Sequence, residues 1–384
     1  MKPVILESIR FSSIDVTTRT TWVFAEIFDA EGISEVVEIT SGNNSSAVAK
    51  TLREIGNNIN GLSISGDSEL LSLLTITTKA LETDTVLATA MSALRTSVSC
   101  FQARYESLSL TEHLGGTVKD KVPLYANINR SLLGDNRSPT HFAKAAEKAV
   151  NNGFTTIKCA PFDEVTSDMK LGDIIDASKT GLERVRSIRL SVGNQINILV
   201  DCHSRFTLET APHICAELAS IDVKWFEEPV APETKSDELS QIASIIDLPI
   251  AGGESGYGTS FFDNLLDKNS LEIIMPDIKF CGGVNEAIKA SLSASQKGKR
   301  FSLHNPSGPV SQLLSAHVTA AVSDSMPLEH AVDETDWRAD IMSPAEEIRD
   351  GFFWIPIGHS IGSVLNQKII QNKGVQWGIY TDKY

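Results

Sequence analysis

The sequence predicts an α/β protein: a barrel of eight parallel strands with a helix between each pair, (β/α)7β, joined to a smaller α+β domain. The first reason is length, because 384 residues are too many for one small domain and suffice for a barrel plus a second domain. The second is an alternation of short apolar strands and helical segments that begins near Val122. The third is the lack of a GxGxxG motif after any strand, which disfavours an open dinucleotide-binding sheet.

The composition is typical of a folded globular protein, with 41% hydrophobic and 22% charged residues. The 34 basic and 49 acidic residues give a formal net charge of −15, the wrong sign for binding nucleic acid or an anionic membrane. The five cysteines form no CxxC pair, no apolar stretch is long enough to cross a membrane, and the first residues do not read as a signal peptide. We therefore expect a soluble, cytoplasmic protein with reduced thiols.

The residues before the barrel mix strands and helices. Strands are expected over residues 20–32 and 34–42, and helical periodicity covers residues 46–60 and 66–110. After residue 331 the alternation stops, and we expect the tail to fold back onto the N-terminal part. The expected division is a capping domain over residues 1–120, a catalytic barrel over 121–331 and a segment over 332–384 that returns to the capping domain.

Eight apolar segments are the expected barrel strands, and the last six begin at nearly regular intervals. Ser138 and Pro139, an N-cap residue followed by proline at the first helical position, open the helix between the first two strands. The expected strands are PLYANI (123–128), TTIKCAP (155–161), INILVDCH (196–203), VKWFEEP (223–229), PIAGGE (249–254), LEIIMPDI (271–278), RFSLHN (300–305) and MPLEH (326–330).

Carboxylates end three successive strands of this barrel: Asp201, Glu227 and Glu254. All strand ends of such a barrel face one mouth, so these side chains are expected to converge. Three carboxylates without a cation would repel one another, and a set of oxygen ligands with an open side favours Mg²⁺. The alternative is that each acid is held at the rim by a lysine or a helix N-terminus, and the matching positions on three strands disfavour it.

The next two strands end in Asp277 and His304. A carboxylate beside an imidazole fixes its tautomer and raises its basicity, which suits a general base, although a lone buried histidine is more often structural. The third strand continues into His203 and Arg205. His203 could share the face of Asp201 and act as an acid, and Arg205 could bind a carboxylate or pair with a rim acid. The other histidines are interpreted as structural: His113, His141, His213, His317, His330 and His359.

Eight segments together resemble the enolase superfamily, and within it the mandelate racemase-like group. They are IKCAPF, LVDCHSRF, WFEEPV, IAGGESG, IMPDIKFCGGVNEA, SLHNPSGPVS, PLEHA and the tail segment DGFFWIPIGHSIG. The resemblance covers about residues 20–365. It implies a TIM-like barrel, a capping domain built from both ends of the chain, a Mg²⁺ cofactor and a homo-oligomer.

The resemblance also implies roles for individual residues. Asp277 and His304 match a dyad that removes the proton α to a carboxylate, and Glu329 matches a glutamate that hydrogen-bonds the substrate carboxylate or enolate. The Mg²⁺ ligands would be Asp201, Glu227 and Glu254. Residues 12–20 would form a flexible loop that closes the mouth, with Arg19 as a candidate specificity residue. Asn127 after the first strand is a candidate substrate contact, although turn capping explains it equally well.

One departure from the family pattern bears on the reaction. Many members carry KxK on the second strand, whereas this chain has Lys158-Cys159-Ala160 and lacks the second lysine base. Lys158 would offset the charge of the substrate carboxylate and enolate. Lys279, two residues after Asp277, is interpreted as structural. The ending Asp201-x-His203-x-Arg205 resembles that of acid-sugar dehydratases such as galactonate and mannonate dehydratases, in which the matching histidine protonates the departing hydroxyl.

These features predict a Mg²⁺-dependent hydro-lyase. It would remove the α-proton of a sugar acid, an aldonate or aldarate, and eliminate the 3-hydroxyl to give a 2-keto-3-deoxy acid. A racemase or epimerase and a lactone cycloisomerase of the same superfamily are the alternatives. A metal-binding barrel without catalytic activity is a third. The expected partner is a small carboxylate, with neither nucleic acid nor membrane.

Overall fold

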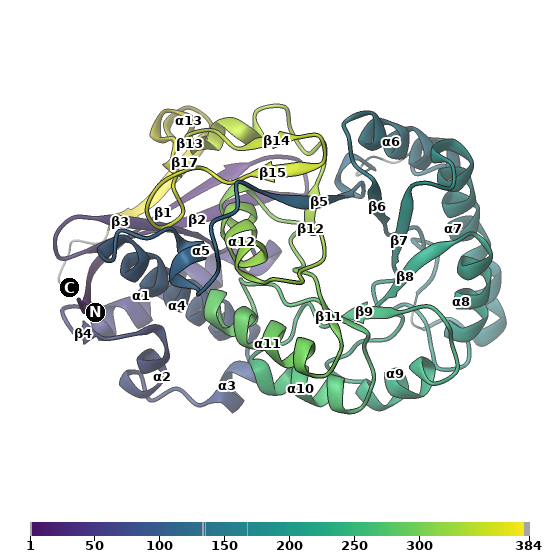
Figure 1. Ribbon diagram of the computed structural model, residues 1–384, viewed down its shortest axis with the longest axis horizontal. Helices are drawn as coiled ribbons and strands as arrows, with labels where there is room; N and C mark the ends of the chain where they lie inside the picture. Colours follow the sequence, from purple (N-terminus) through teal and green to yellow (C-terminus); the bar gives the residue numbers. More distant parts are fainter. Residues whose placement is uncertain (1, 133, 135, 167, 380–384) are drawn as a thin grey trace.

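The computed structural model describes residues 2–132, 134, 136–166 and 168–379. Figure 1 shows a ring of strands and surrounding helices, coloured teal to green, beside a smaller part formed by both ends of the chain, coloured purple and yellow. None of the helices in the described ranges is long and apolar enough to cross a membrane.

Eight parallel strands form the central sheet. Each of the eight apolar segments predicted as strands overlaps one of them, in the order β11-β10-β9-β8-β7-β6-β5, with β12 on the other side of β5. Met326, two residues before β12, donates its backbone N–H to the carbonyl of Phe301 on β11 at 2.9 Å. The strands are β5 (Lys121–Asn127), β6 (Thr156–Cys159), β7 (Asn197–Asp201), β8 (Val223–Glu227), β9 (Ile250–Gly252), β10 (Ile273–Ile274), β11 (Arg300–Phe301) and β12 (Leu328–Ala331).

A helix follows each strand from β5 to β11 and lies on the outside of the strand ring (Figure 1). Pro139 occupies the first turn of α6, where its missing N–H costs no hydrogen bond. The hydroxyl of Ser138 contacts His141 Nδ1 at 2.7 Å rather than capping the backbone. The helices are α6 (Pro139–Asn151), α7 (Leu171–Val192), α8 (Ala211–Ser220), α9 (Ser236–Ala243), α10 (Thr259–Asp267), α11 (Val284–Gln296) and α12 (Pro309–Ala321).

An apolar layer inside the strand ring supports the polar strand ends. Side chains two residues apart on a strand share a face, so Trp225 lies below Glu227 and Tyr125 below Asn127. The rings of Tyr125 and Trp225 meet edge to face with centroids 5.5 Å apart. This buried layer comprises Tyr125, Leu199, Trp225, Ala251, Ile273 and Met275.

The smaller part is built around an antiparallel sheet in the order β17-β1-β2-β3, with β4 also paired to β1. Its strands are β1 (Val4–Asp15), β2 (Thr21–Asp29), β3 (Ser34–Glu38), β4 (Ser63–Ile64) and β17 (Gly374–Ile379). Its helices are α1 (Ser45–Ile59), α2 (Leu70–Leu73), α3 (Thr78–Thr83), α4 (Thr85–Tyr105) and α5 (Leu110–His113). Because β17 pairs with β1, the two ends of the chain share one sheet.

Two local predictions need correction. Residues 12–15 belong to β1 and not to a loop, because their backbone pairs with β2 as far as Asp15 opposite Thr21. The predicted helix over residues 66–110 is divided into separate helices, and the extended backbone of Asp84 separates α3 from α4. The Asp84 side chain accepts a hydrogen bond from Leu87 N and starts α4 there.

The C-terminal segment runs from the parallel strands to the antiparallel sheet. β15 (Phe352–Trp354) pairs antiparallel with β5 and with β14 (Glu347–Arg349). β13 (Met342–Ser343) pairs with β16 (Val364–Leu365), and α13 (Gln367–Lys373) leads into β17. The turn between β1 and β2 meets the segment after β5, where Arg130 Nη1 donates to Thr20 Oγ1 at 3.2 Å.

Candidate active site

Lys158 on β6 lies at the centre of a buried charge cluster. Its Nζ is 2.8 Å from Glu227 Oε1 on β8 and 2.7 Å from Glu329 Oε1 on β12. The lysine is only 1% exposed. Burial by itself lowers the pKa of Lys158, but the carboxylates of Glu227 and Glu329 outweigh it and hold that pKa well above its usual range. The ammonium group is therefore charged and balances two carboxylates.

The two carboxylates that contact Lys158 differ in their surroundings. Burial raises the pKa of Glu227 to about 8, with Asp201 and other nearby carboxylates acting in the same direction and Lys158 opposing them. For Glu329, Lys158 and then His304 outweigh burial and lower the pKa. Two further donors hold Glu329: Asn127 Nδ2 is 2.7 Å from Oε1, and the backbone N–H of Asn305 is 2.9 Å from Oε2.

Asp201 at the end of β7 is paired with His203. The Nε2 of His203 is 2.8 Å from Asp201 Oδ2, and the backbone N–H of His203 donates to Oδ1 at 2.9 Å. Against burial, His203 lowers the pKa of Asp201 to about 2, and Asp201 raises the pKa of His203. The contact arises from a turn rather than from the strand face we predicted, since His203 and Ser204 have φ of 47° and 57°. The His203 side chain remains 50% exposed.

His304 lies between two carboxylates. Its Nδ1 is 3.0 Å from Asp277 Oδ2, and its Nε2 is 3.0 Å from Glu254 Oε2. Glu254 is the leading attraction that raises the pKa of His304 to about 9 against burial. Asp277 is fully buried and is also held by Lys279, whose backbone N–H donates to Oδ1 at 2.8 Å and whose Nζ is 3.2 Å from Oδ2. Asp277, which holds Nδ1, is fully buried, whereas Glu254, which contacts Nε2, is partly exposed, so Nε2 is the atom of His304 that faces the more open side of the cluster.

Asp201, Glu227 and Glu254 each carry a cationic or imidazole partner here. No group of three His, Cys, Asp or Glu side chains in the described ranges has the arrangement of a metal site. The donor set nevertheless fits a hard divalent cation. Glu227 Oε2 is buried without a hydrogen-bond partner, and the charges of Asp201 and Glu254 both raise the pKa of Glu227. A cation among these oxygens would remove the repulsion between them.

Two predicted substrate-binding residues lie apart from this cluster. Arg205 Nη1 donates to the carbonyls of Phe162, Asp163 and Val165, at distances of 2.8 to 3.0 Å, and so fastens the loop after β6. Arg19 is exposed in the turn between β1 and β2. The third, Asn127, lies within the cluster but is hydrogen-bonded to Glu329, as described above.

Sequence reasoning missed three residues that complete the site. Glu228 is buried and follows Glu227 directly, so the doubled acid in WFEEP was a usable signal. Tyr125 lies under Lys158, whose Nζ is 5.6 Å from the ring centroid, and its hydroxyl is buried without a partner. Asn305 contributes a backbone N–H to Glu329, which no side-chain pattern reveals.

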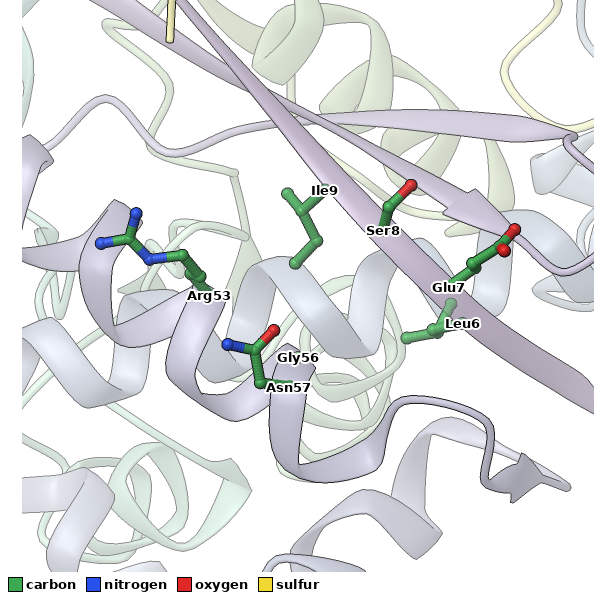
Figure 2. Close-up of a pocket in the computed structure, with 7 residues that line it drawn as sticks. All are labelled: Leu6, Glu7, Ser8, Ile9, Arg53, Gly56 and Asn57. Carbon is green, nitrogen blue, oxygen red and sulfur yellow. The ribbon is translucent and has the colours of Figure 1, made fainter. Parts of the chain in front are cut away.

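A separate small hollow lies between β1 and α1. Figure 2 shows its lining, which includes Ile9 from the strand and Gly56 from the helix. Its volume of about 20 Å³ has room for roughly one water molecule. The hollow contains none of the predicted site residues and is too small for a sugar acid. This hollow is therefore not a candidate active site.

Comparison with known proteins places the chain in a family. A model of the family described as "Enolase C-terminal domain-like" matches residues 141–369. This match covers more than half of the chain, which therefore belongs to the enolase C-terminal domain-like family. The resemblance drawn from the strand-end motifs is thereby confirmed.

Individual relatives agree with this assignment. The chain is 28% identical over 268 residues to a D-xylonate dehydratase of Haloferax volcanii, a match that covers 67% of this chain and 63% of that protein. It is 27% identical over 285 residues to a D-gluconate dehydratase of Thermoproteus tenax, covering 74% of this chain and 56% of that protein. The chain thus matches less than two thirds of the length of these curated relatives.

Solved structures share the fold over nearly the whole chain. A member of the enolase superfamily from Salmonella Typhimurium has a TM-score of 0.85 and 21% identity, with 98% of this chain and 100% of that chain covered. A mandelate racemase/muconate lactonizing enzyme from Jannaschia sp. CCS1 has a TM-score of 0.82 and 21% identity, with 99% of each chain covered.

Proposed function

We propose that the protein is a Mg²⁺-dependent sugar-acid dehydratase, which removes the α-proton of an aldonate or aldarate and eliminates the 3-hydroxyl to give a 2-keto-3-deoxy acid. The observation that carries the proposal is the convergence of two imidazoles, His203 and His304, on one group of strand-end carboxylates. The names of the D-xylonate and D-gluconate dehydratases among its relatives support the same class of substrate.

Asp201, Glu227 and Glu254 would hold the Mg²⁺. When bound, this ion would supply positive charge that stabilises the enediolate formed from the substrate carboxylate. Lys158 adds a fixed positive charge beside Glu227 and Glu329. Glu329, held by Lys158 and Asn305, would hydrogen-bond the substrate carboxylate or enolate.

His304 would take the proton from C2. Its Nε2 is the accepting atom, because Asp277 holds Nδ1 and fixes the orientation of the ring. The C2–H electrons would then form the C2–C3 double bond as the C3–O bond breaks. The half-exposed His203 would give its proton to the departing hydroxyl, which leaves as water. The resulting enol tautomerises to the 2-keto acid.

We further infer the finer architecture. The eight strands would close into a (β/α)7β TIM-like barrel over residues 121–331, which the hydrogen bond from Met326 to Phe301 supports. Residues 1–120 and 332–384 would form the capping domain, which the pairing of β17 with β1 supports. Arg19 is a candidate specificity residue. Arg205 is a candidate for binding a carboxylate of the substrate from the loop after β6, which its Nη1 fastens.

The proposal is tested by incubating the protein with Mg²⁺ and a panel of aldonates and aldarates, D-xylonate and D-gluconate first, and assaying 2-keto acid with semicarbazide. We expect product from at least one acid and its loss in His304→Asn and in His203→Asn. Exchange of the α-proton for deuterium without any keto acid would instead indicate a racemase or epimerase. Activity on a lactone that survives His203→Asn would indicate a cycloisomerase. Mg²⁺ binding without α-proton exchange for any acid would indicate a barrel without catalytic activity.

A further inference from the structure

We propose that Glu228 is a positioning residue that fixes the ends of β7, β8 and β9 relative to one another, and with them the backbone of Glu254. The inference rests on the proposed function, in which Asp201, Glu227 and Glu254 hold a divalent cation from these same three strand ends. Glu228 acts through its neighbours and not as a ligand.

The side chain of Glu228 is bound to the end of β9. Its Oε1 accepts the backbone N–H of Gly253 at 2.9 Å and lies 3.4 Å from the backbone N of Glu254. The residue is 7% exposed, so these bonds form out of contact with bulk water, where they hold geometry more firmly. The carboxylate of Glu228 therefore fixes the backbone from which the Glu254 side chain extends toward His304.

The backbone of Glu228 is bound to the other two strand ends. Its carbonyl accepts the N–H of Ser204 at 2.8 Å, directly after His203, and its own N–H donates to Ala251 at 3.0 Å. One residue thus connects the turn after β7, the end of β8 and the end of β9. Neighbouring Glu227 contacts Lys158 instead, so the two adjacent glutamates have different partners.

The backbone strain at Glu228 indicates that its side chain is needed at this position. Glu228 has φ of 40°, a left-handed conformation that is strained for a residue with a side chain. A Cβ at Gly252 would lie 2.8 Å from Glu228 Cγ, so the glycine makes room for the side chain. A residue needed only to end a strand would require neither the strained backbone nor the facing glycine.

The test uses the full-length protein with Mn²⁺ as the probe, its binding followed by loss of the free-ion signal in electron paramagnetic resonance. A second measurement, on metal-free protein, is hydrogen–deuterium exchange of the segment that contains Gly253 and Glu254. The variants are Glu228→Ala and Glu228→Gln, since glutamine retains an oxygen that can accept the same N–H groups.

The matched control is Glu38→Ala. Glu38 is also buried and accepts two backbone N–H groups, from Gly308 at 2.8 Å and Ser311 at 3.0 Å, and it also faces a glycine, Gly308, whose Cβ would lie 2.8 Å away. It belongs to β3 and makes no contact with β7, β8 or β9 among the hydrogen bonds of the described residues. The Glu38→Ala variant therefore measures how far the loss of a similar buried glutamate elsewhere in the fold affects Mn²⁺ binding and exchange.

We expect Glu228→Ala to weaken Mn²⁺ binding by about 10–100-fold, as removal of outer partners does at other metal sites, and to speed exchange at Gly253 and Glu254. Glu228→Gln should retain most of the Mn²⁺ affinity, and its exchange at Gly253 and Glu254 should stay slow. Glu38→Ala should change neither the affinity nor the exchange. The proposal would be overturned if Gly253 and Glu254 exchanged as slowly in Glu228→Ala as in the wild-type protein. It would also be overturned if the alanine and glutamine variants of Glu228 lost Mn²⁺ affinity equally. An equal effect of Glu38→Ala would overturn it as well. If the wild-type protein fails to bind Mn²⁺, the proposed function fails, and the exchange of the Glu228 variants still decides this inference.

Discussion

At the scale of the residue, the site is a set of compensated charges. Lys158 neutralises Glu227 and Glu329, His203 pairs with Asp201, and His304 bridges two carboxylates, Glu254 and Asp277. Each acid of the cluster thus has a partner, although most are buried far from water. Removing one partner leaves a charge that neither solvent nor protein can balance.

Lys158→Met tests this compensation. The variant leaves Glu227 and Glu329 buried without their cation, and breaking such a buried pair costs about 3–5 kcal/mol. We expect the free energy of unfolding in urea, followed by circular dichroism, to fall by that amount. Adding Glu329→Gln to the variant should restore part of the loss. Wild-type stability in the single variant would show that the lysine does not balance these carboxylates.

Asp277→Asn tests the dyad. An amide in place of the carboxylate can present N–H to His304 Nδ1 and favour the wrong tautomer, so Nε2 loses its function as a base. On any sugar acid that the wild-type enzyme dehydrates, we expect kcat to fall by about 10²–10⁴-fold, with a smaller change in KM. Undiminished kcat in a folded variant would remove the dyad from the mechanism.

At the scale of the element, caps determine where helices begin, and turns determine which polar side chains lie at the strand ends. Periodicity alone joined residues 66–110, whereas Asp84 starts a new helix within them. Likewise β7 ends at Asp201, and two left-handed residues then return His203 to it. Polar side chains at these positions satisfy backbone N–H groups that regular hydrogen bonding leaves unpaired.

Asp84→Ala should lower the free energy of unfolding by about 0.5–2 kcal/mol, because α4 loses the acceptor for Leu87 N. Asp84→Asn should retain most of the stability, since asparagine caps comparably. The exposed Glu82, two positions earlier, supplies the control, and Glu82→Ala should change stability by at most about 0.5 kcal/mol. Equal stability of all three variants in urea would show that Asp84 does not set the start of the helix.

At the scale of the whole molecule, segments distant in sequence meet around buried polar groups. Arg95 on α4 forms salt bridges to Asp67 at 2.9 Å and to Glu286 on α11 at 3.0 Å, joining the N-terminal part to the barrel. His317 on α12 lies 2.9 Å from Thr111 Oγ1 on α5 and 3.2 Å from the carbonyl of Ile361 in the tail. Such contacts join the two ends of the chain to the helices that follow β10 and β11.

The His317 contacts predict a pH dependence of stability. Burial lowers the pKa of His317 to about 4, below its usual 6.5, so the unfolded chain binds more protons between these values. The contribution of His317 to the free energy of unfolding is therefore complete above about pH 6.5. It is lost as the pH falls toward 4, and the total loss is about 3 kcal/mol. In urea unfolding at several pH values, His317→Gln should flatten this slope, whereas the exposed His359→Gln should keep it. Parallel slopes for His317→Gln and wild type would contradict the prediction.

The sequence by itself determined the eight strands and the family, because short apolar segments and the polar motifs at their ends are local properties of the chain. It also named most of the charged residues of the candidate site, since parallel strands bring their carboxyl ends to one side. Only the tertiary structure decided the partners: Lys158 between Glu227 and Glu329, Arg205 on backbone carbonyls, and Glu228 on the end of β9. Those pairings depend on which side chains meet across strands distant in sequence, and on backbone N–H and carbonyl groups that carry no residue identity.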